Sequence, residues 1–256
     1  MIYFISDQHL GLGNPQSDKR REQALLKFLT AIKPHCERLF ILGDLFDYWF
    51  EYTTVVQKQH IRTLAALADF ADAGIPVDYL IGNHDFGHHT FFREHLGITI
   101  HPHDLDITLH SKRFYLAHGD GKAFNDNGYL FIRSILRNPL AQRAWRWLHP
   151  DIGIGIAAYF SRRSRAASFD KNYTSKRHDN ELKGLEHFAA EKIAQGWDYV
   201  IMGHLHTVVE QVIERQSGSA ESGLYVNLGT WLEEPVCAVF DGMTVRVLRG
   251  GDVLAQ

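Results

Sequence analysis

The chain is poor in cysteine and has no long run of apolar residues. Its two cysteines, Cys36 and Cys237, lie far apart in a sequence of 256 residues, which excludes a disulfide framework and favours a reducing compartment. We expect both to be small buried hydrophobic residues. No apolar stretch approaches the roughly 18 residues that span a bilayer, and the amino terminus shows no secretory signal. These absences predict a protein of the cytosol or of the cytosolic face of a membrane.

The chain also lacks a strong net charge and low-complexity segments. Its formal charge is −3, which argues against a wholly basic nucleic-acid-binding protein. Apolar residues make up 45% of the chain, enough for one large globular domain or for one domain with an insertion. We therefore expect a folded protein without a nucleic-acid partner, and nothing in the sequence calls for an obligate protein partner.

Five short apolar runs are continuous in hydrophobicity, as strands buried on both faces are, and each run ends in metal-binding side chains. Ligands gather beyond the carboxyl ends of the strands in sheets of this kind. Ionisable groups at the edge of a core cost free energy unless they are paired or bound to a metal, so we expect a metal site. The runs are 2–5 before Asp7-Gln8-His9, 39–42 before Gly43-Asp44, 77–81 before Gly82-Asn83-His84-Asp85, 114–117 before His118-Gly119-Asp120, and 199–202 before Gly203-His204-Leu205-His206.

Apolar residues at helical spacing predict helices between the first three strands and before the fifth. The tail differs, because it contains three further predicted strands, the last two joined by a hairpin turn at Asp241-Gly242. This alternation makes the fold class α/β. The predicted helices are 21–31, 55–73 and 180–195, and the further strands are 224–228, 236–240 and 245–248.

The segment from residue 127 to residue 177 departs from this pattern. It contains ten Lys or Arg residues against two acids, an excess of eight positive charges, so the remainder of the chain carries −11. Apolar and aromatic residues such as Trp145 and Trp147 are interleaved with the bases. We expect a basic, aromatic-rich helical insertion in a core formed by residues 1–126 and 178–256. Two interpretations stay open: a surface for anionic lipid and phosphorylated ligands, or a subdomain that buries its apolar residues and exposes its arginines.

Seven side chains at the five strand ends are candidate metal ligands. They combine imidazole nitrogens with carboxylate and amide oxygens and include no thiolate, which disfavours a structural zinc site. Seven donors are more than one ion uses, and a carboxylate such as Asp44 can bridge two first-row cations such as Mn, Fe or Zn. Two cations about 3.5–4 Å apart activate water and hold phosphoryl oxygens, which is the chemistry of phosphoester hydrolysis. The seven are Asp7, His9, Asp44, Asn83, His118, His204 and His206.

The order of these motifs resembles that of the calcineurin-like metallophosphoesterases, and the match covers nearly all of the chain outside the insertion. It comprises Asp7-x-His9, Gly43-Asp44, Gly82-Asn83-His84-Asp85, His118 and Gly203-His204-x-His206. The resemblance implies a four-layer αββα sandwich, two central sheets flanked by helices. It also implies two ligand sets: Asp7, His9, Asp44 and His206 around one ion, and Asp44, Asn83, His118 and His204 around the other.

Within that family, the sequence resembles the branch that acts on UDP-2,3-diacylglucosamine in lipid A biosynthesis. The resemblance is carried by the run 43–49, the stretch from His118 to Asp126, and the basic insertion. It implies hydrolysis of the diphosphate to UMP and 2,3-diacylglucosamine 1-phosphate, dependence on Mn, and a peripheral position on the cytoplasmic face of the inner membrane. The insertion is then a lid over the acyl chains. The implied substrate contacts are Asn83, Asp126, Arg165 and Lys176.

One position departs from the branch, whose best-known enzymes carry Arg where this chain has His84. We expect His84 and Asp85 to be catalytic: His84 neutralises charge that develops on the phosphoryl oxygens, and Asp85 orients its ring. General acid catalysis gains little for this substrate, because a sugar 1-phosphate is already a good leaving group. The alternative is that His84 only supports neighbouring ligands. Asp47, three residues after Asp44, is expected to cap or support rather than to bind metal.

Two further hypotheses for the function stay open. One is a soluble metallophosphoesterase that acts on a nucleotide, a phosphodiester or a phosphoprotein. The other is a non-catalytic binding scaffold of the same fold. A scaffold of that kind usually has lost ligands, whereas all seven candidate ligands are present in this chain.

Overall fold

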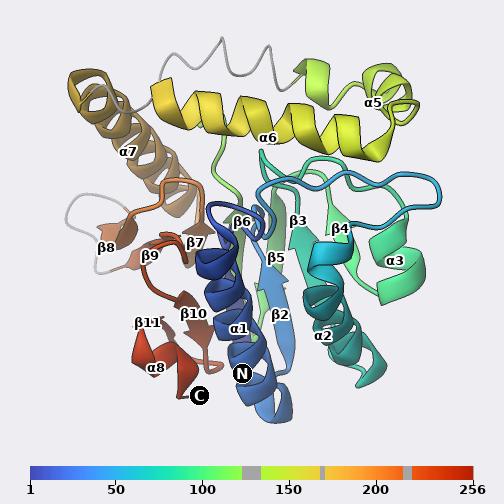
Figure 1. Ribbon diagram of the computed structural model, residues 1–256. Coiled ribbons are helices and arrows are strands. Elements are labelled where there is room, and N and C mark those ends of the chain that lie inside the picture. The colour runs from blue at the N-terminus through green and yellow to red at the C-terminus, as the bar shows by residue number, and fades with distance from the viewer. Residues whose placement is uncertain (123–133, 168–170, 216–220, 256) are drawn as a thin grey trace.

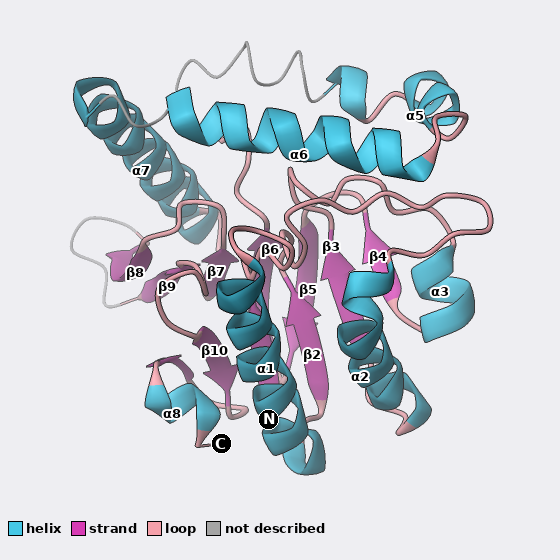
Figure 2. Cartoon of the chain, viewed as in Figure 1, coloured by secondary structure: helices cyan, strands magenta, loops and turns pink. Residues whose placement is uncertain are grey.

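The chain folds into two β-sheets that pack against each other, with helices on the outer faces (Figures 1 and 2). The structure is a computed structural model that describes residues 1–122, 134–167, 171–215 and 221–255, without the side chains at 158 and 160–177. This arrangement confirms the four-layer αββα sandwich that the family resemblance implies.

The first sheet has six strands in the order β11-β10-β1-β2-β3-β4. Strands β1 to β4 run parallel, so their carboxyl ends meet at one edge, while β10 and β11 continue the sheet in antiparallel pairing. The strands are β1 (Ile2–Ile5), β2 (Arg38–Ile41), β3 (Val77–Leu80), β4 (Thr99–His101), β10 (Val236–Phe240) and β11 (Val245–Arg249).

The second sheet has five strands in the order β5-β6-β7-β9-β8. Strands β6, β7 and β9 run parallel, and β5 and β8 form antiparallel edges. The strands are β5 (Leu105–Leu109), β6 (Lys112–Ala117), β7 (Tyr199–Met202), β8 (Val208–Glu214) and β9 (Ser222–Leu228).

Both faces of the central strands are covered, which explains why these strands are continuous in hydrophobicity. In β1, Phe4 faces the second sheet and stacks on Phe40 and Phe114, with ring centroids 5.2 and 5.7 Å apart. The next residue back, Tyr3, points the other way and meets Phe28 of the first helix edge-on at 5.9 Å. Alternate side chains of one strand therefore belong to two different apolar layers.

Helices on the outer faces complete the four layers. Helices α1 (Pro15–Ile32), α2 (Ile61–Asp72) and α3 (Phe91–Leu96) pack on the first sheet. Helix α7 (Lys171–Ala194) packs on the second sheet. Two short 3₁₀ turns, Lys33–His35 and Lys58–His60, and the helix α8 (Gly251–Leu254) are further short elements of the core.

Two helices begin away from their predicted starts. Helix α1 begins at Pro15 rather than at residue 21, because the Asn14 side chain accepts hydrogen bonds from the backbone of its first turn. That turn is polar, so the apolar spacing does not reveal it. Helix α2 begins at Ile61 rather than at residue 55. Val55 and Val56, which the prediction included in the helix, are exposed in the preceding loop.

The predicted insertion contains α5 (Pro139–Trp145) and α6 (Pro150–Ala167), which lie across the loops at one end of the sheets (Figure 1). Trp145 Nε1 donates to the Tyr48 hydroxyl at 2.9 Å, so the insertion contacts the loop after β2. The boundary predicted between residues 177 and 178 lies inside α7, without a break in the helix. The described helices include none long and apolar enough to cross a membrane.

Candidate metal centre

All seven candidate ligands lie on the loops that follow β1, β2, β3, β6 and β7. Parallel pairing within each sheet brings these loops to the same end of the fold. Backbone hydrogen bonds then join loops that are distant in sequence. The Asp7 N–H donates to the Gly43 carbonyl at 3.2 Å, and the Gly203 N–H donates to the His118 carbonyl at 2.9 Å.

Most of the candidate ligands have a left-handed backbone conformation. Residues other than glycine rarely adopt positive φ, because the Cβ atom crowds the backbone. Such conformations persist where the surrounding structure fixes them, and they cluster at functional sites. The five are Asp7 (φ 57°), His9 (46°), Asp44 (53°), His204 (71°) and His206 (59°).

Glycines allow the loops to approach the carboxylates closely. A Cβ atom on Gly82 would overlap Oδ1 of Asp44, and one on Gly203 would overlap Oδ2 of Asp7. The glycines in these motifs are therefore required for space. The same close approach explains why each glycine directly precedes a candidate ligand.

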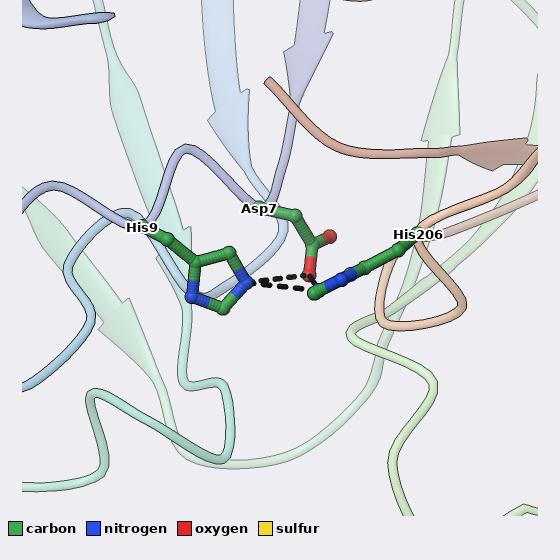
Figure 3. A group of neighbouring side chains, drawn as sticks. All are labelled: Asp7, His9 and His206. Atoms are coloured by element: carbon green, nitrogen blue, oxygen red, sulfur yellow. Dashed lines mark hydrogen bonds and ion pairs between the residues drawn. The ribbon is translucent and has the colours of Figure 1, made fainter. Parts of the chain in front are cut away.

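Asp7, His9 and His206 converge on one point (Figure 3). Nε2 of His9 lies 2.9 Å from Nε2 of His206, and Oδ1 of Asp7 lies 3.6 and 3.4 Å from these two nitrogens. Ligand atoms about 2.1 Å from one octahedral cation are about 3 Å apart. The three side chains thus have the spacing of ligands to a single ion.

The Asp7 carboxylate has one satisfied and one unsatisfied oxygen. Oδ2 accepts hydrogen bonds from the Ser6 hydroxyl and from the His204 N–H, the latter at 3.0 Å. Oδ1 is buried and has no hydrogen-bond partner among the described residues. Its nearest partners are the imidazole nitrogens of His9 and His206, at 3.6 and 3.4 Å, and a cation among these three atoms would give the oxygen a closer positive partner.

His118, Asn83 and His204 form a second convergent group. Oδ1 of Asn83 lies 2.9 Å from Nε2 of His118 and 2.9 Å from Nδ1 of His204. Nδ1 of His118 donates to the Leu42 carbonyl at 2.8 Å, so Nε2 is the ring nitrogen that can bind a metal once it has lost its own proton. Metal-binding histidines are commonly oriented in this way.

Asp44 lies between the two groups. Its Oδ2 is 3.4 Å from Nε2 of His118 and 3.8 Å from Nε2 of His9. Its Oδ1 accepts a hydrogen bond from the His84 N–H at 2.9 Å. The same carboxylate therefore faces both sets of donors, as a bridging ligand would.

The electrostatics of the centre favour a bound cation. Burial opposes ionisation of Asp7 and Asp44, but the surrounding imidazoles hold the pKa of both carboxyls well below the usual range. Burial also opposes protonation of the imidazoles, yet hydrogen bonds and attraction to the carboxylates raise the pKa of His9 to about 9 and that of His118 to about 10. Without a metal, protons neutralise this negative charge.

His84 faces the centre as a neutral ring. Burial lowers its pKa, and its ring lies 4.9 Å from that of His9, edge to face. Nδ1 of His84 donates to the Asp47 carbonyl at 3.0 Å and lies 3.5 Å from the Asp47 carboxylate, whose Oδ1 is also 3.6 Å from Nδ1 of His9. Asp47 therefore orients two imidazoles at once.

Asp85 acts differently from the prediction that it orients the His84 ring. Its carboxylate accepts hydrogen bonds from the Leu45 N–H at 3.0 Å, from the Gly82 N–H at 2.9 Å and from the Tyr79 hydroxyl. It thus joins the loop of Asp44 to the loop of Asn83, and Asp47 takes the orienting position. Burial, followed by repulsion from Asp44, raises the pKa of Asp85 to about 6.

Three of the four predicted substrate contacts cannot be placed by their side chains. Asp126 lies outside the described residues, and Arg165 in α6 and Lys176 in α7 belong to the stretch without described side chains. Asn83 lies in the centre, as given above. Their roles stay predictions.

One residue of the insertion reaches the centre without having been predicted from the sequence. Arg137 donates to the Gly82 carbonyl at 3.2 Å and lies 3.7 Å from the carboxylate of Asp120. Asp120 is buried two residues after His118. No local signal distinguishes Arg137 from the other nine bases of the insertion, because its role depends on which loop it meets.

The two-sheet fold with mixed nitrogen and oxygen donors at its edge defines a class of metal-dependent phosphoesterases. The sequence model of the calcineurin-like phosphoesterase family matches residues 1–208. The chain therefore belongs to the calcineurin-like phosphoesterase family, and it is a metal-dependent hydrolase.

Several curated relatives within this family share one name. The chain is 31% identical over 255 residues to the UDP-2,3-diacylglucosamine hydrolase of Porphyromonas gingivalis, covering 95% of both chains. It is 30% identical to the protein of that name from Pectobacterium carotovorum, covering 90% of this chain and 91% of the relative. The protein of that name from Edwardsiella ictaluri is 29% identical, with 89% of this chain and 83% of the relative covered.

The donor set fits the divalent cations that this family implies. Two groups of nitrogen and oxygen atoms converge, a carboxylate faces both groups, and one buried oxygen of Asp7 lacks a donor. Such borderline and hard donors suit first-row divalent ions. The seven predicted ligands are therefore all brought together, although which ion each one binds stays a prediction.

Proposed function

We propose that this protein hydrolyses the diphosphate of UDP-2,3-diacylglucosamine, releasing UMP and 2,3-diacylglucosamine 1-phosphate in lipid A biosynthesis. The observation that carries the proposal is the extent of the likeness to its curated relatives. The family model ends at residue 208, whereas the relative from Porphyromonas gingivalis aligns over 95% of both chains. The likeness therefore continues past the end of the family model into the carboxyl-terminal strands.

The proposed cofactor is a pair of divalent cations, Mn in the first place and Fe or Zn as alternatives. One ion lies among Asp7, His9, Asp44 and His206, and the other among Asp44, Asn83, His118 and His204. The distances support this division, because each set contains atom pairs 2.9 Å apart and Oδ2 of Asp44 lies between the sets.

The reaction adds water across the diphosphate and breaks the bond from the phosphorus next to uridine to the bridging oxygen. When bound, the cations supply an activated water and neutralise the phosphoryl oxygens. His84 enters as a neutral ring whose Nε2 accepts, because Nδ1 donates to Asp47. The negative diphosphate favours protonation of this nitrogen, and the charged ring then stabilises the phosphoryl oxygens as expected from the sequence.

The insertion is proposed to cover the acyl chains and to hold the protein on the cytoplasmic face of the inner membrane. Its side chains include several that are apolar and largely exposed: Leu140 is 76% exposed, Trp147 88% and Ile152 55%. Exposed aromatic and aliphatic groups beside an excess of positive charge suit an anionic lipid surface. We keep residues 127–177 as the insertion and residues 1–126 and 178–256 as the core in this proposal.

The test is to incubate the purified protein with Mn²⁺ and UDP-2,3-diacylglucosamine and to follow UMP by chromatography. Asp44→Asn should form UMP at least about 100-fold more slowly, since even residues that only support a metal ligand contribute 10–100-fold. Asp69→Asn, on the exposed face of α2, is the matched control and should keep full activity.

The two other hypotheses, a soluble metallophosphoesterase and a binding scaffold, predict different results in the same assay. Absence of UMP together with rapid hydrolysis of a soluble phosphodiester would move the assignment to a soluble metallophosphoesterase. A binding scaffold would turn over neither substrate, and Asp44→Asn would leave its cellular role intact. The convergence of all seven donors argues against that outcome.

A further inference from the structure

A short segment at the end of β9, where the chain leaves the second sheet for the first, contacts the loop of Asp7 and the loop of His204 and His206. Residues 227–231, here called the clasp, comprise the last two residues of β9 and the turn that leads toward β10. They lie beyond residue 208, where the match to the family model ends. The clasp contains no candidate metal ligand, and neither its composition nor its position in the sequence predicts a role in the centre.

Asn227 fixes the loop that carries His204. Its side chain is fully buried, and Nδ2 donates to the Gly203 carbonyl at 2.5 Å while Oδ1 accepts from the Gly229 N–H at 3.2 Å. The peptide group after Gly203 carries the His204 N–H, which donates to Oδ2 of Asp7. Asn227 therefore holds one end of the peptide whose other end holds the Asp7 carboxylate.

Thr230 fixes the backbone of Asp7 itself. Its hydroxyl donates to the Asp7 carbonyl at 3.0 Å, and the Trp231 N–H donates to the same carbonyl at 3.1 Å. Trp231 is anchored in turn, because it is 2% exposed and its Nε1 donates to the Val236 carbonyl at 2.8 Å. The buried, hydrogen-bonded side chain of Trp231 therefore fixes the part of the clasp that contacts the Asp7 carbonyl.

These contacts act on residues whose backbone conformation is unfavourable. Asp7 and His204 both have positive φ, at 57° and 71°. A non-glycine residue stays in this region only where its neighbours fix it. Hydrogen bonds to the Asp7 carbonyl and to the peptide of His204 do this without touching the ligand atoms.

We infer that Asn227 and Thr230 are positioning residues of the metal centre, which set the affinity for the cations by fixing Asp7 and His204. The inference rests on the proposed metal centre and not on the identity of the substrate. A simpler role, in which the clasp only connects the sheets, predicts lower stability of the variants with unchanged metal affinity.

The experiment compares three variants by calorimetric titration of the metal-free protein with Mn²⁺. Thr230→Val keeps the shape of the side chain and removes the donor to Asp7, so Mn²⁺ should bind 10–100-fold more weakly. Thr230→Ser keeps the hydroxyl and should restore affinity to within about threefold of the wild type. Thr63→Val is the matched control, because Thr63 is also buried and its hydroxyl bonds Glu22, within the helical layer.

A fourth variant, Asn227→Leu, tests the other half of the clasp and should weaken Mn²⁺ binding to a similar extent. If it fails to fold, the threonine series still decides the matter. Equal Mn²⁺ affinity for wild type and Thr230→Val would overturn the inference while leaving the metal centre standing. Absence of Mn²⁺ binding by the wild type would instead overturn the metal centre, and with it the clasp. Titration of metal alone is independent of whether UMP is formed.

Discussion

At the scale of single residues, the centre combines groups that are unfavourable one by one. Two buried carboxylates and several buried imidazoles lie within ion-pair distance, on a backbone with five non-glycine residues at positive φ. Isolated buried charges cost free energy, and so do left-handed conformations. A cation at each group offsets the first cost, so metal-free and metal-loaded protein should respond differently to pH.

We predict that Mn²⁺ affinity rises with pH between pH 7 and 9. The pKa of His9 is raised to about 9 and that of His118 to about 10. Both rings are therefore positively charged at pH 7 in the metal-free protein, with a proton on each ring nitrogen. A cation must displace both protons, which makes affinity change by up to about 100-fold per pH unit. Titrations in two buffers of different ionisation enthalpy should report the release of about two protons.

The stability of the metal-free protein provides the complementary measurement. A histidine pKa raised on folding stabilises the native state fully below its unfolded value near 6.5 and ceases to do so as pH rises through the folded value. The melting temperature of the metal-free protein should therefore fall between pH 7 and 10, whereas the Mn²⁺-loaded protein should change less. A buffer-independent titration, with no proton release, would contradict this account of His9 and His118.

At the scale of elements, the centre depends on short strands that end at a common edge and on loops packed without spare volume. Strands β1, β2, β3 and β7 have four residues each, and the ligands follow within a few residues. Small changes of loop backbone therefore move ligand atoms directly.

We predict that Gly82→Ala and Gly203→Ala weaken Mn²⁺ binding by at least about tenfold and lower the free energy of unfolding by roughly 1–3 kcal/mol. The added methyl group overlaps Asp44 in the first variant and Ser6 and Asp7 in the second. Gly155→Ala in α6 is the matched control, since nothing lies within 4 Å of the added atom. It should bind Mn²⁺ normally and gain about 0.5–1 kcal/mol in helix stability. Normal Mn²⁺ affinity in all three variants would disprove the argument from loop packing.

The contact between Arg137 and the Asn83 loop yields a second prediction at this scale. Arg137→Ala removes a charged donor to the Gly82 carbonyl and the cation beside buried Asp120, so the free energy of unfolding should fall by roughly 1–2 kcal/mol and UMP formation should slow. Arg143→Ala, at an exposed position of α5, should stay within about 0.5 kcal/mol of the wild type. Urea unfolding and the UMP assay measure both effects. Identical behaviour of the two variants would show that Arg137 does not support the loop.

At the scale of the whole molecule, the insertion gives the protein two chemically different ends. Helices α5 and α6 lie over the loops of the metal centre, and the turn between β10 and β11 lies toward the other end (Figure 1). The exposed apolar side chains of α5 and α6 are the ones that the proposed membrane contact would bury.

We predict that Trp147→Ala weakens binding to vesicles containing anionic phospholipid by about tenfold, the equivalent of about 1.4 kcal/mol. Met243→Ala is the matched control. Met243 is also a large apolar side chain exposed to solvent, at 72% compared with 88% for Trp147, but it lies in the turn after β10. Replacing several insertion arginines should reduce binding further, more at low salt than at high salt. Sedimentation with vesicles measures all variants, and equal binding throughout would favour an insertion that only packs on the core.

Much of this architecture follows from local sequence patterns. The bounds of β1, β7 and β10 agree with the predicted runs, and the hairpin turn at Asp241-Gly242 joins β10 to β11. Short elements such as β4 and α3 were not predicted, because three to six residues carry too little periodicity. The start of α1 was missed because its first turn is polar.

The sequence by itself determined which donors are present and that they follow strands buried on both faces, because residue type and hydrophobic period are properties of a local stretch. Only the tertiary structure decided that Asn83 meets both His118 and His204, that Asp44 lies between the groups, and that Asp47 rather than Asp85 orients His84. Distances between side chains of different loops depend on how the two sheets pack and on the absence of a Cβ atom at glycines such as Gly82 and Gly203. No local pattern encodes those distances, so they arise only when the whole chain has folded.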